Sequence, residues 1–580
     1  MNNIKEYGNV LYYCIFALLL IYSENKNMKS KYTLFMVSAL GMASVASAQT
    51  QYDAFRLSEN ELNGTARFVG MGGAMGALGA DISVMGTNPA GIGLFRGHDL
   101  STSFSFNSTQ VKSDFNGTSM KEKKNQMSFD QIGFVYSTKI GNKTALRYFN
   151  FGFNYHKSNN LNKLFSVGGL LDGLSQTNQI ANMIGGAVSD IGEIDNIYNY
   201  GVKGHEKLPN PYDPVNSNYP YLGVMGVRTE LVAVGDNNTL KGWNGDGNYY
   251  HSREEGGIQQ YDFNVSFNVQ DKMFFGLTLG VYDVDYRRTT HYSEDIFDQN
   301  PEFQQPHIGY YELNNTFRTS GTGTNLKLGA IFRPIDDSAF RFGVAIHTPT
   351  WYRLTDIYNS NVYSEMSYQV KNEAGEVVTK DFNANELISD YVGGEVLQDY
   401  RLTTPWKFNV NLGTVFGGIM AVGAEYEYTD YSSAKLYYSD GYEMSNQNQY
   451  LSEDLKGVHT LRLGMETKLT SCFSVRAGYN FSTQAFKETA YKALNWNDMR
   501  TDTEYNNKFS QNTVTVGLGY RGRLFYADFA YKYNLYKSDF YSFSDINLQA
   551  AKLTNERHQA LVTVGIHCLL YTSPSPRDCS

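Results

Sequence analysis

The chain has 580 residues, a formal net charge of −9 at pH 7, a pI near 5.7 and a mean hydropathy of −0.41. This acidic balance lacks the basic surface that nucleic-acid binding requires, so nucleic acid is excluded as an expected partner. Of the four cysteines only Cys472 lies outside the two terminal segments considered below, which excludes a disulfide framework and a cysteine-based zinc site.

A leader is expected before the mature sequence. Residues 28–48 combine a charged start, an apolar middle and the small-residue end Ala46-Ser47-Ala48, which is the pattern of a secretory signal peptide cleaved after Ala48. Residues 1–27 hold a second apolar run that is too short to span a bilayer. We interpret these first residues as translation from an upstream start codon, with a longer, unusual signal peptide as the alternative.

Residues 49–99 lack any alternation and contain the densest glycine cluster of the chain. They are too apolar for a solvated linker, so they need a surface on which to pack. If the remainder is a wide barrel, as argued below, the economical place is its lumen. Glycine suits such a plug because it lets backbone approach backbone and adopts positive φ angles. The glycines expected to do this are Gly70, Gly72, Gly73, Gly76 and Gly79.

The same segment ends in Asn88-Pro89-Ala90-Gly91. Proline biases Asn88 away from helical backbone angles and offers no amide donor, so we expect a turn here. Three methionines of the segment, Met71, Met75 and Met85, are candidates for a soft apolar pocket. Ordinary packing against the barrel wall explains them equally well.

Strand-like alternation begins near residue 100. Between Tyr261 and Val269 every odd residue is apolar or aromatic and every even residue is polar, which is the period of a strand with one face in each solvent. Charged residues keep to the polar parity, as Lys407, Glu425 and Asp528 show. We place strands near 100–109, 127–138, 146–157, 259–269, 273–288, 323–333, 340–349, 402–415, 419–430, 458–469, 473–483, 511–521, 524–537 and 557–567.

The connections between these strands alternate in length. Short ones such as 270–272 and 522–523 alternate with long ones, of which 158–258 is the longest. Short periplasmic turns and long external loops are the asymmetry of outer-membrane barrels, whose even strand number returns both termini to the periplasm. A soluble sandwich has no reason to obey this rule. The other long connections are 289–322, 350–401, 431–457, 484–510 and 538–556.

The expected fold class is therefore all-β. It is an antiparallel transmembrane β-barrel of about fourteen strands over residues 100–567, with an N-terminal lumenal hatch, or plug, at 49–99. Residues 568–580 look like the translated read-through of a sequencing adapter, and we exclude them. Cys568 takes the outward position at which such barrels commonly end in an aromatic residue, so we expect a Phe or Tyr to have been lost there.

The run from Ala66 to Leu94, with its Ala-Arg-x-x-Gly-Met-Gly-Gly-Ala start and Asn-Pro-Ala-Gly end, resembles the N-terminal hatch of the FadL/TodX family of outer-membrane transporters. That family carries long-chain fatty acids and other hydrophobic compounds, and some relatives bear the label hemin receptor. The resemblance implies a fourteen-stranded barrel plugged by the hatch, with Asn88, Pro89 and Ala90 as the hatch motif. Residues 158–258 exceed the corresponding loop of a typical member, so ligand contacts from loops are not carried over.

What the resemblance implies for function is passive uptake in the outer membrane. An apolar ligand caught by external loops would enter a greasy pocket and leave when the hatch rearranges, in some members sideways through a gap in the wall. The implied protein is a monomer and not an enzyme, with no cofactor or metal. Its implied partners are the hydrophobic ligand, outer-membrane lipid and lipopolysaccharide, and the barrel assembly machinery. The ligand stays open among fatty acid, aromatic hydrocarbon, bile acid and haem.

Other functions remain as alternatives. Barrels of the same family also serve as shuttle proteins of the type IX secretion system, and a haem receptor would need an axial His or Tyr ligand. An outer-membrane lipase or protease is not expected, because the ten histidines show no catalytic or metal-binding spacing. In the longest loop, apolar residues at near-helical spacing over 166–191 predict either a first capture surface or a cap that packs on its own residues.

Overall fold

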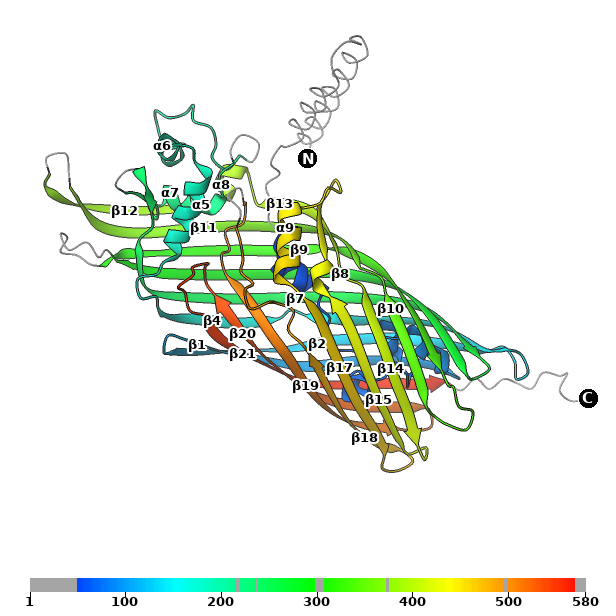
Figure 1. The fold of residues 1–580 in the computed structure, drawn as a ribbon. Coiled ribbons are helices and arrows are strands. Elements are labelled where there is room, and N and C mark those ends of the chain that lie inside the picture. Colours follow the sequence, from blue (N-terminus) through cyan, green and yellow to red (C-terminus); the bar gives the residue numbers. More distant parts are fainter. Residues whose placement is uncertain are drawn as a thin grey trace, which may run out of the picture.

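The structure is a computed structural model that describes residues 49–213, 218–235, 238–297, 307–371, 375–494 and 498–568. The leader expected at 1–48 and the tail after Cys568 lie outside these residues. Within them, one large antiparallel sheet closes on itself where β1 (His98–Phe115) pairs with β21 (Ala551–Cys568). The result is a closed fourteen-stranded barrel, which confirms the predicted fold class (Figure 1).

The wall strands follow one another around the barrel in chain order, and several are split by a short break. After β1 come β2 (Thr118–Lys139), β3 (Leu146–Asn160) with β4 (Lys163–Leu170), β7 (Asn244–Val269), β8 (Met273–Phe297), β9 (His307–Phe332), β10 (Arg341–His347) with β11 (Trp351–Lys371), β13 (Val396–Thr403) with β14 (Lys407–Phe416), β15 (Met420–Asp430) with β16 (Lys435–Tyr438), β17 (Gly457–Lys468), β18 (Phe473–Ser482), β19 (Tyr505–Arg521), β20 (Phe525–Tyr541) and β21. An extra strand, β12 (Val377–Leu387), pairs with β11.

The remaining helices and short strands belong to the N-terminal segment or to the outer loops. The N-terminal segment contains helices α3 (Gln51–Ser58) and α4 (Ala66–Gly70) and the 3-10 helices η1 (Ile82–Gly86) and η2 (Pro89–Leu94). The outer loops contain α5 (Gln176–Ala187), α6 (Gly192–Asn199), α7 (Tyr221–Arg228), β5 (Ala233–Val234), β6 (Leu240–Lys241), α8 (Ser389–Val392), η4 (Tyr431–Ser433) and α9 (Ser445–Asp454).

In the wall, many polar side chains are buried and many apolar side chains are exposed, which is the reverse of the pattern in a soluble protein. On β7, Asp262 and Asn264 are fully buried in the lumen, whereas Phe263 and Phe267 between them are 43% and 38% exposed on the outside. Similar rows of exposed Phe, Leu, Val and Tyr run along the other strands, for example Phe408, on β14. A continuous outward apolar band needs lipid as its solvent. The barrel is therefore a transmembrane barrel. No helix among the described residues is long and apolar enough to cross a bilayer.

The strands extend well past the membrane on one side. β7, β8 and β9 have 26, 25 and 26 residues, whereas about ten suffice to cross the hydrocarbon core. The long connections predicted at 289–322 and 350–401 therefore contain long β-hairpins, and the wall strands extend beyond their predicted bounds. The reason is physical: beyond the bilayer both faces of a strand meet water or polar partners, so the apolar alternation that marks a strand in the sequence stops at the membrane edge.

Two neighbouring strands break at prolines on the outer edge of the apolar band. Pro349 separates β10 from β11, and Pro405 separates β13 from β14. A proline has no amide donor and interrupts a ladder. Beside these breaks, Trp351 and Trp406 are 49% and 46% exposed. Exposed tryptophans prefer the membrane–water interface, so they mark the height at which the outer leaflet's headgroups begin.

Candidate functional site

The N-terminal segment folds into short helices, each begun by a polar side chain. Thr50 forms a capping box at the start of α3. Thr65, Asp81 and Asn88 accept hydrogen bonds from amides at the starts of α4, η1 and η2. Such caps satisfy the amides that a helix start leaves without partners. The glycine-rich sequence is thereby compact without forming a strand.

Figure 1 shows the blue elements of this segment alongside the strands of the wall, and most residues of the segment are buried. Asn150, on β3, donates a hydrogen bond to the carbonyl of Ile92 at 2.7 Å. Thr563, on β21, accepts one from the Ala66 amide, also at 2.7 Å. Polar lumen side chains therefore hold the backbone of the segment directly, and we call residues 65–95 the hatch body.

The predicted motif residues Asn88 and Pro89 form a turn against β7, β8 and β9. Asn88 is fully buried, and its side-chain oxygen accepts from the Ala90 amide at 3.2 Å. Pro89 takes the first position of η2, where its missing amide costs nothing. Its carbonyl accepts from Asn264 Nδ2 and Ser266 Oγ, both at 3.3 Å. The motif therefore presents one backbone carbonyl to the polar inner wall.

The next two motif residues are small because neighbours leave no room. Ala90 is fully buried against Phe274 and Ile331 of the wall. A Cβ atom on Gly91 would lie 2.7 Å from Cγ2 of Val84, which is closer than atoms can approach. Ala90 and Gly91 thus set how tightly η2 packs between η1 and the wall.

Four of the five predicted hatch glycines serve either positive φ angles or close approach. Gly72, Gly73 and Gly79 have φ angles of 63°, 83° and 61°. At Gly76 a Cβ would collide with the side chain of Asn411, whereas at Gly70 the nearest atom, the Cα of Gly517, would lie at an ordinary contact distance of 3.4 Å.

The sequence analysis did not predict which wall residues lie against the hatch glycines. Gly413, Gly423, Gly464 and Gly478 are direct cross-strand neighbours on β14, β15, β17 and β18, and we call them the glycine row. A Cβ on Gly464 would lie 2.2 Å from the Met71 carbonyl oxygen. One signal was available: each of these glycines falls on the inward parity of its strand, where the neighbouring residues are polar or charged.

Substituting the glycine row should unseat the hatch body. In Gly478→Ala the new Cβ would lie 2.2 Å from the Gly72 amide nitrogen, so the hatch must shift, at a cost of about 1–3 kcal/mol. We expect a lower melting temperature and faster proteolysis within residues 65–95. Gly247→Ala on β7 is the matched control, since the nearest atom to its Cβ is 3.6 Å away. Equal proteolysis of the two variants would show that the row does not seat the hatch.

The three methionines lie in the interior of the hatch. Met71, Met75 and Met85 are buried in a cluster with hatch residues such as Phe68 and with Val135 of the wall. None of the three lines the lumen cavities described next. Their burial agrees with the alternative of ordinary packing against the barrel wall.

Two cavities lie in the lumen between the hatch body and the outer loops. The outer cavity, about 190 Å³, is bounded by α3, β4, Lys492 and loop residues 500–504. The inner cavity, about 120 Å³, is bounded by the hatch body and the inner faces of β10, β14, β15 and β17. Residues 59–61 line both cavities and lie between them.

The lining of the outer cavity is both charged and aromatic, which differs from the greasy pocket that the family resemblance implied. Seven basic side chains face seven acidic ones, interleaved with aromatic rings that include Phe165, Tyr250 and Tyr536. The basic residues are Arg56, Lys163, Arg288, Lys492, Arg500, Lys508 and Arg557, and the acidic ones are Asp53, Glu59, Glu61, Glu254, Asp502, Glu504 and Glu556. Such a lining suits a ligand with both a charged and an apolar part.

Seven of these fourteen charges are paired in one buried network that joins α3 to Lys492 and residues 500–504 of an outer loop. Arg500 Nη1 lies 2.6 Å from Asp53 Oδ2, and Arg500 Nη2 lies 2.5 Å from Asp502 Oδ2. Arg288 and Lys492 also contact Asp502. Burial by itself would raise the pKa of Asp53, but Arg500 and Arg56 outweigh it and hold that pKa well below its usual range. The N-terminal helix is therefore tied to the outer mouth through charge.

Lys163 stands apart from the other basic residues of the outer cavity, each of which forms an ion pair. Its ammonium lies 4.7 Å from the ring centre of Phe165 and 6.0 Å from that of Tyr536, and among the described residues it forms no ion pair within 4.0 Å. A buried cation without a carboxylate partner is costly. Lys163 is thus the group of the outer cavity with the most to gain from an anionic ligand.

The wall beside this cavity lacks backbone hydrogen bonds over one stretch. The ladder between β2 and β3 ends at Gln131 and His156. Beyond that height, among the described residues, β2 pairs with β1 only and β3 and β4 pair with β7 only. The break between β3 and β4 falls at Leu161, which lines the outer cavity. The side chains of Lys157 and Ser128 bridge the gap at 2.7 Å. Above this height, side-chain hydrogen bonds such as that from Ser113 to the carbonyl of Ser166, at 2.6 Å, take the place of the backbone ladder.

The outer mouth is closed by a helical cap. Ile180 and Ile184 of α5 are fully buried against Val224 and other residues of α7, in the largest apolar cluster of the described chain. Helix α5 therefore agrees with the packed-cap alternative. The helical spacing predicted from residue 166 was wrong over 166–170, which belong to strand β4 and end in Leu170, 56% exposed. Helix α7 itself was not foreseen, because its sequence Tyr-Leu-Gly-Val-Met-Gly-Val-Arg has no polar face to give it helical periodicity.

Comparisons with known proteins give similarities of fold. No family model matches the chain, and no curated protein matches it. Among solved structures, a Pseudomonas aeruginosa FadL homologue is 13% identical, with a TM-score of 0.48, covering 87% of this chain and 99% of that one. The P. putida toluene transporter TodX is 12% identical, with a TM-score of 0.43 and coverage of 87% and 99%. The Ralstonia pickettii toluene transporter TbuX is 14% identical, with a TM-score of 0.39 and coverage of 88% and 99%.

Proposed function

We propose that this chain is an outer-membrane transport barrel of the FadL/TodX type, which takes up hydrophobic or amphipathic small molecules by a gated, passive route. The observation that carries the proposal is a lumen obstructed at two levels. The cap covers the outer mouth, and the hatch body, with Asn88, Pro89 and Ala90 in it, packs against the inner wall. An open porin would leave a continuous aqueous channel instead. Passage then requires the hatch or the wall to move.

The chemistry of the outer cavity favours an anionic amphiphile among the candidates. A neutral aromatic hydrocarbon would leave Lys163 without a counter-ion and would gain nothing from the surrounding charges. A carboxylate on an apolar body, as in a fatty acid or a bile acid, would pair with Lys163 and place its apolar part against Phe165 and Tyr536. The two sides of such a ligand match the two kinds of side chain in the cavity.

Two exits follow from the geometry. One leads sideways through the stretch between β2 and β3 that has no backbone ladder, directly beside Leu161. The other leads through the inner cavity and past the hatch body to the periplasm. The sideways exit leaves an apolar ligand in the bilayer, its preferred solvent. Both exits agree with passive transport, because neither requires an energy source.

Lipid extraction and native mass spectrometry of the purified barrel test this function. We expect a co-purified anionic amphiphile, and we expect Lys163→Gln to retain about tenfold less of it, because the substitution removes one charge-assisted contact worth about 1.5–3 kcal/mol. Lys552→Gln is the control, because Lys552 is exposed and pairs with Asp539 outside the cavity.

A second measurement distinguishes a gated transporter from a pore. Liposomes carrying the barrel should exclude small sugars, and removal of residues 49–99 should admit them. If the intact barrel retains no ligand and passes sugars freely, it is a general porin. Co-purification with a secreted protein in place of a small molecule would favour the type IX secretion alternative.

A further inference from the structure

The arginines on the outside of the barrel, beyond the apolar band, fall into two groups. Arg253 pairs with Glu255 at 2.7 Å, and Arg287 and Arg318 share Asp285 at 3.8 and 3.3 Å. Arg353 on β11 and Arg401 on β13 form no ion pair with any described residue. All of these side chains are exposed, so screening by water makes each charge tolerable. The proximity of two unpaired arginines of like charge nevertheless requires an explanation.

Arg353 and Arg401 are direct cross-strand partners in the antiparallel pair of β11 and β13. Side chains in such positions have Cβ atoms about 5 Å apart, and like charges there are destabilising. Arg401 uses one donor on the carbonyl of Ser439 at 2.5 Å. Among the described residues, no side chain or carbonyl accepts a hydrogen bond from its other donors or from the guanidinium fork of Arg353. An anion placed between the two guanidinium groups would turn a repulsion into two attractions.

The surroundings of this arginine pair form a shallow groove of hydroxyl groups and aromatic rings. It is lined by Thr322, Thr324, Trp351, Thr403 and Tyr437 along with the two arginines. The nearest carboxylates are engaged elsewhere: Asp399 accepts from Thr355 Oγ1 at 2.6 Å, and Asp440 accepts from the Tyr442 amide at 3.1 Å. The residues that line the groove thus include two positive charges, several hydroxyl groups and no carboxylate.

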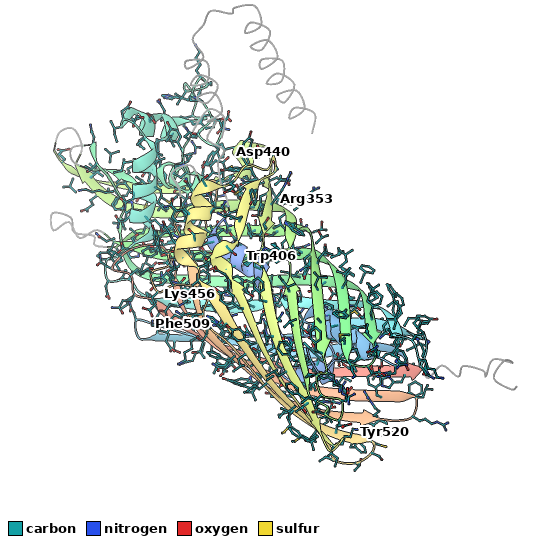
Figure 2. The ribbon with its side chains drawn as sticks, turned by 45° about the vertical axis from the view of Figure 1, so that its right-hand side comes forward. Arg353, Trp406, Asp440, Lys456, Phe509 and Tyr520 are labelled. Carbon is teal, nitrogen blue, oxygen red and sulfur yellow. The ribbon has the colours of Figure 1, made fainter. Side chains whose placement is uncertain are left out.

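The height of the groove identifies the kind of anion. Trp351 and Arg353 are two residues apart on β11, so their side chains point to the same face of the wall. Figure 2 shows Arg353 further from the periplasmic end than Trp406. Both tryptophans mark the interface, so the arginine pair lies at the level of the outer leaflet's headgroups. At this level the abundant anions are the phosphate groups of membrane lipids, and Arg forks bind phosphate in a bidentate manner.

We propose that Arg353 and Arg401 form a binding site for the phosphate group of an outer-leaflet glycolipid, with the threonine hydroxyls and Tyr437 as further donors and Trp351 against the start of its acyl chains. This site rests on the outer-membrane location and is independent of what the lumen carries. Its function is to anchor the extended side of the wall, from β9 to β16, to one lipid and so to fix the height of the barrel in the membrane.

Retention of glycolipid by the full-length barrel tests the site. Barrels are purified from outer membranes, and bound glycolipid is counted by native mass spectrometry. Arg353→Gln together with Arg401→Gln is expected to lose at least about tenfold of the retained phosphorylated glycolipid, because two charge-assisted contacts disappear. The matched control is Arg253→Gln with Arg318→Gln, two exposed arginines of the same wall that have carboxylate partners. Heat-modified gel mobility verifies that every variant is folded.

Readdition of defined lipids to delipidated barrels separates the sources of phosphate. The parent should rebind the phosphorylated glycolipid and not its dephosphorylated form, and inorganic phosphate should fail to displace it. Equal retention by the Arg353/Arg401 variant and the control would overturn the site. Rebinding of the dephosphorylated lipid by the parent would also overturn it, and displacement by inorganic phosphate would show a free-anion site in place of a lipid site.

Discussion

Oxidation of a Gly93→Cys/Phe274→Cys double variant is expected to lower uptake of the hydrophobic ligand about tenfold or more, and reduction is expected to restore it, because a hatch that cannot move cannot open. Gly93 belongs to η2 of the hatch, and Phe274 lies on β8 of the wall. A Cβ on Gly93 would be 3.4 Å from the Cβ of Phe274, close to the spacing of about 3.8 Å that a disulfide prefers. The cross-link would tie the end of the hatch motif to the wall.

The controls separate locking from damage. Each single cysteine variant under the same oxidant reports the cost of losing Gly93 or the Phe274 ring, and Cys472→Ser removes the half-buried native thiol from every sample. A second cross-link, Ile180→Cys/Gly226→Cys, has a Cβ separation of 3.6 Å but joins α5 to α7 within the cap. If the oxidised hatch variant transports as fast as its reduced form, the hatch does not gate passage, and the route lies through the wall between β2 and β3 alone.

The sequence foretold the parts of this molecule that a single local pattern encodes. The two-residue alternation located the membrane-crossing centre of the wall strands, since lipid outside and polar lumen inside impose opposite demands on neighbouring residues. Phe263 is exposed on the outside of the barrel, whereas its neighbour Asp262 is buried in the lumen. The hatch glycines were also readable, because positive φ angles at Gly72 and Gly79 restrict the residue type at one position without reference to the rest of the chain.

What escaped prediction depends on contacts between distant segments. Gly464 is an ordinary strand glycine until Met71, far away in the sequence, lies against it. Arg500 belongs to a polar loop whose partner, Asp53, is 447 residues away. The outer halves of β8 and β9 resembled loops because no lipid imposes an apolar face there. Local sequence patterns therefore predict the strands of the barrel and the glycine-rich N-terminal segment. The cavities in the lumen depend on contacts between residues that are distant in the sequence.

Replacing Arg500 with methionine is expected to loosen the outer mouth and the N-terminal helix together. Arg500 is the shared partner of Asp53 on α3 and Asp502 on the outer loop, and its side chain is 2% exposed. Removing one member of a buried charge network leaves the others uncompensated, at a cost of about 3–5 kcal/mol. Hydrogen exchange should then accelerate in residues 51–58 and 498–504 at once. The exposed arginine variant Arg253→Met, whose partner is Glu255, should change neither segment.

The pH dependence of this effect identifies its cause. Arg500 and Arg56 overcome the effect of burial and hold the pKa of Asp53 below its ordinary value of 3.8. A depressed carboxylate contributes stability above its unfolded pKa and loses it as pH falls toward the folded value. The difference between parent and Arg500→Met should therefore be full at neutral pH and shrink below about pH 4. Adding Asp53→Asn to Arg500→Met should recover part of the loss at neutral pH, because one uncompensated charge is gone. A difference that is constant with pH, with no recovery in the double variant, would mean that Arg500 acts through packing and that charge does not couple the hatch to the mouth.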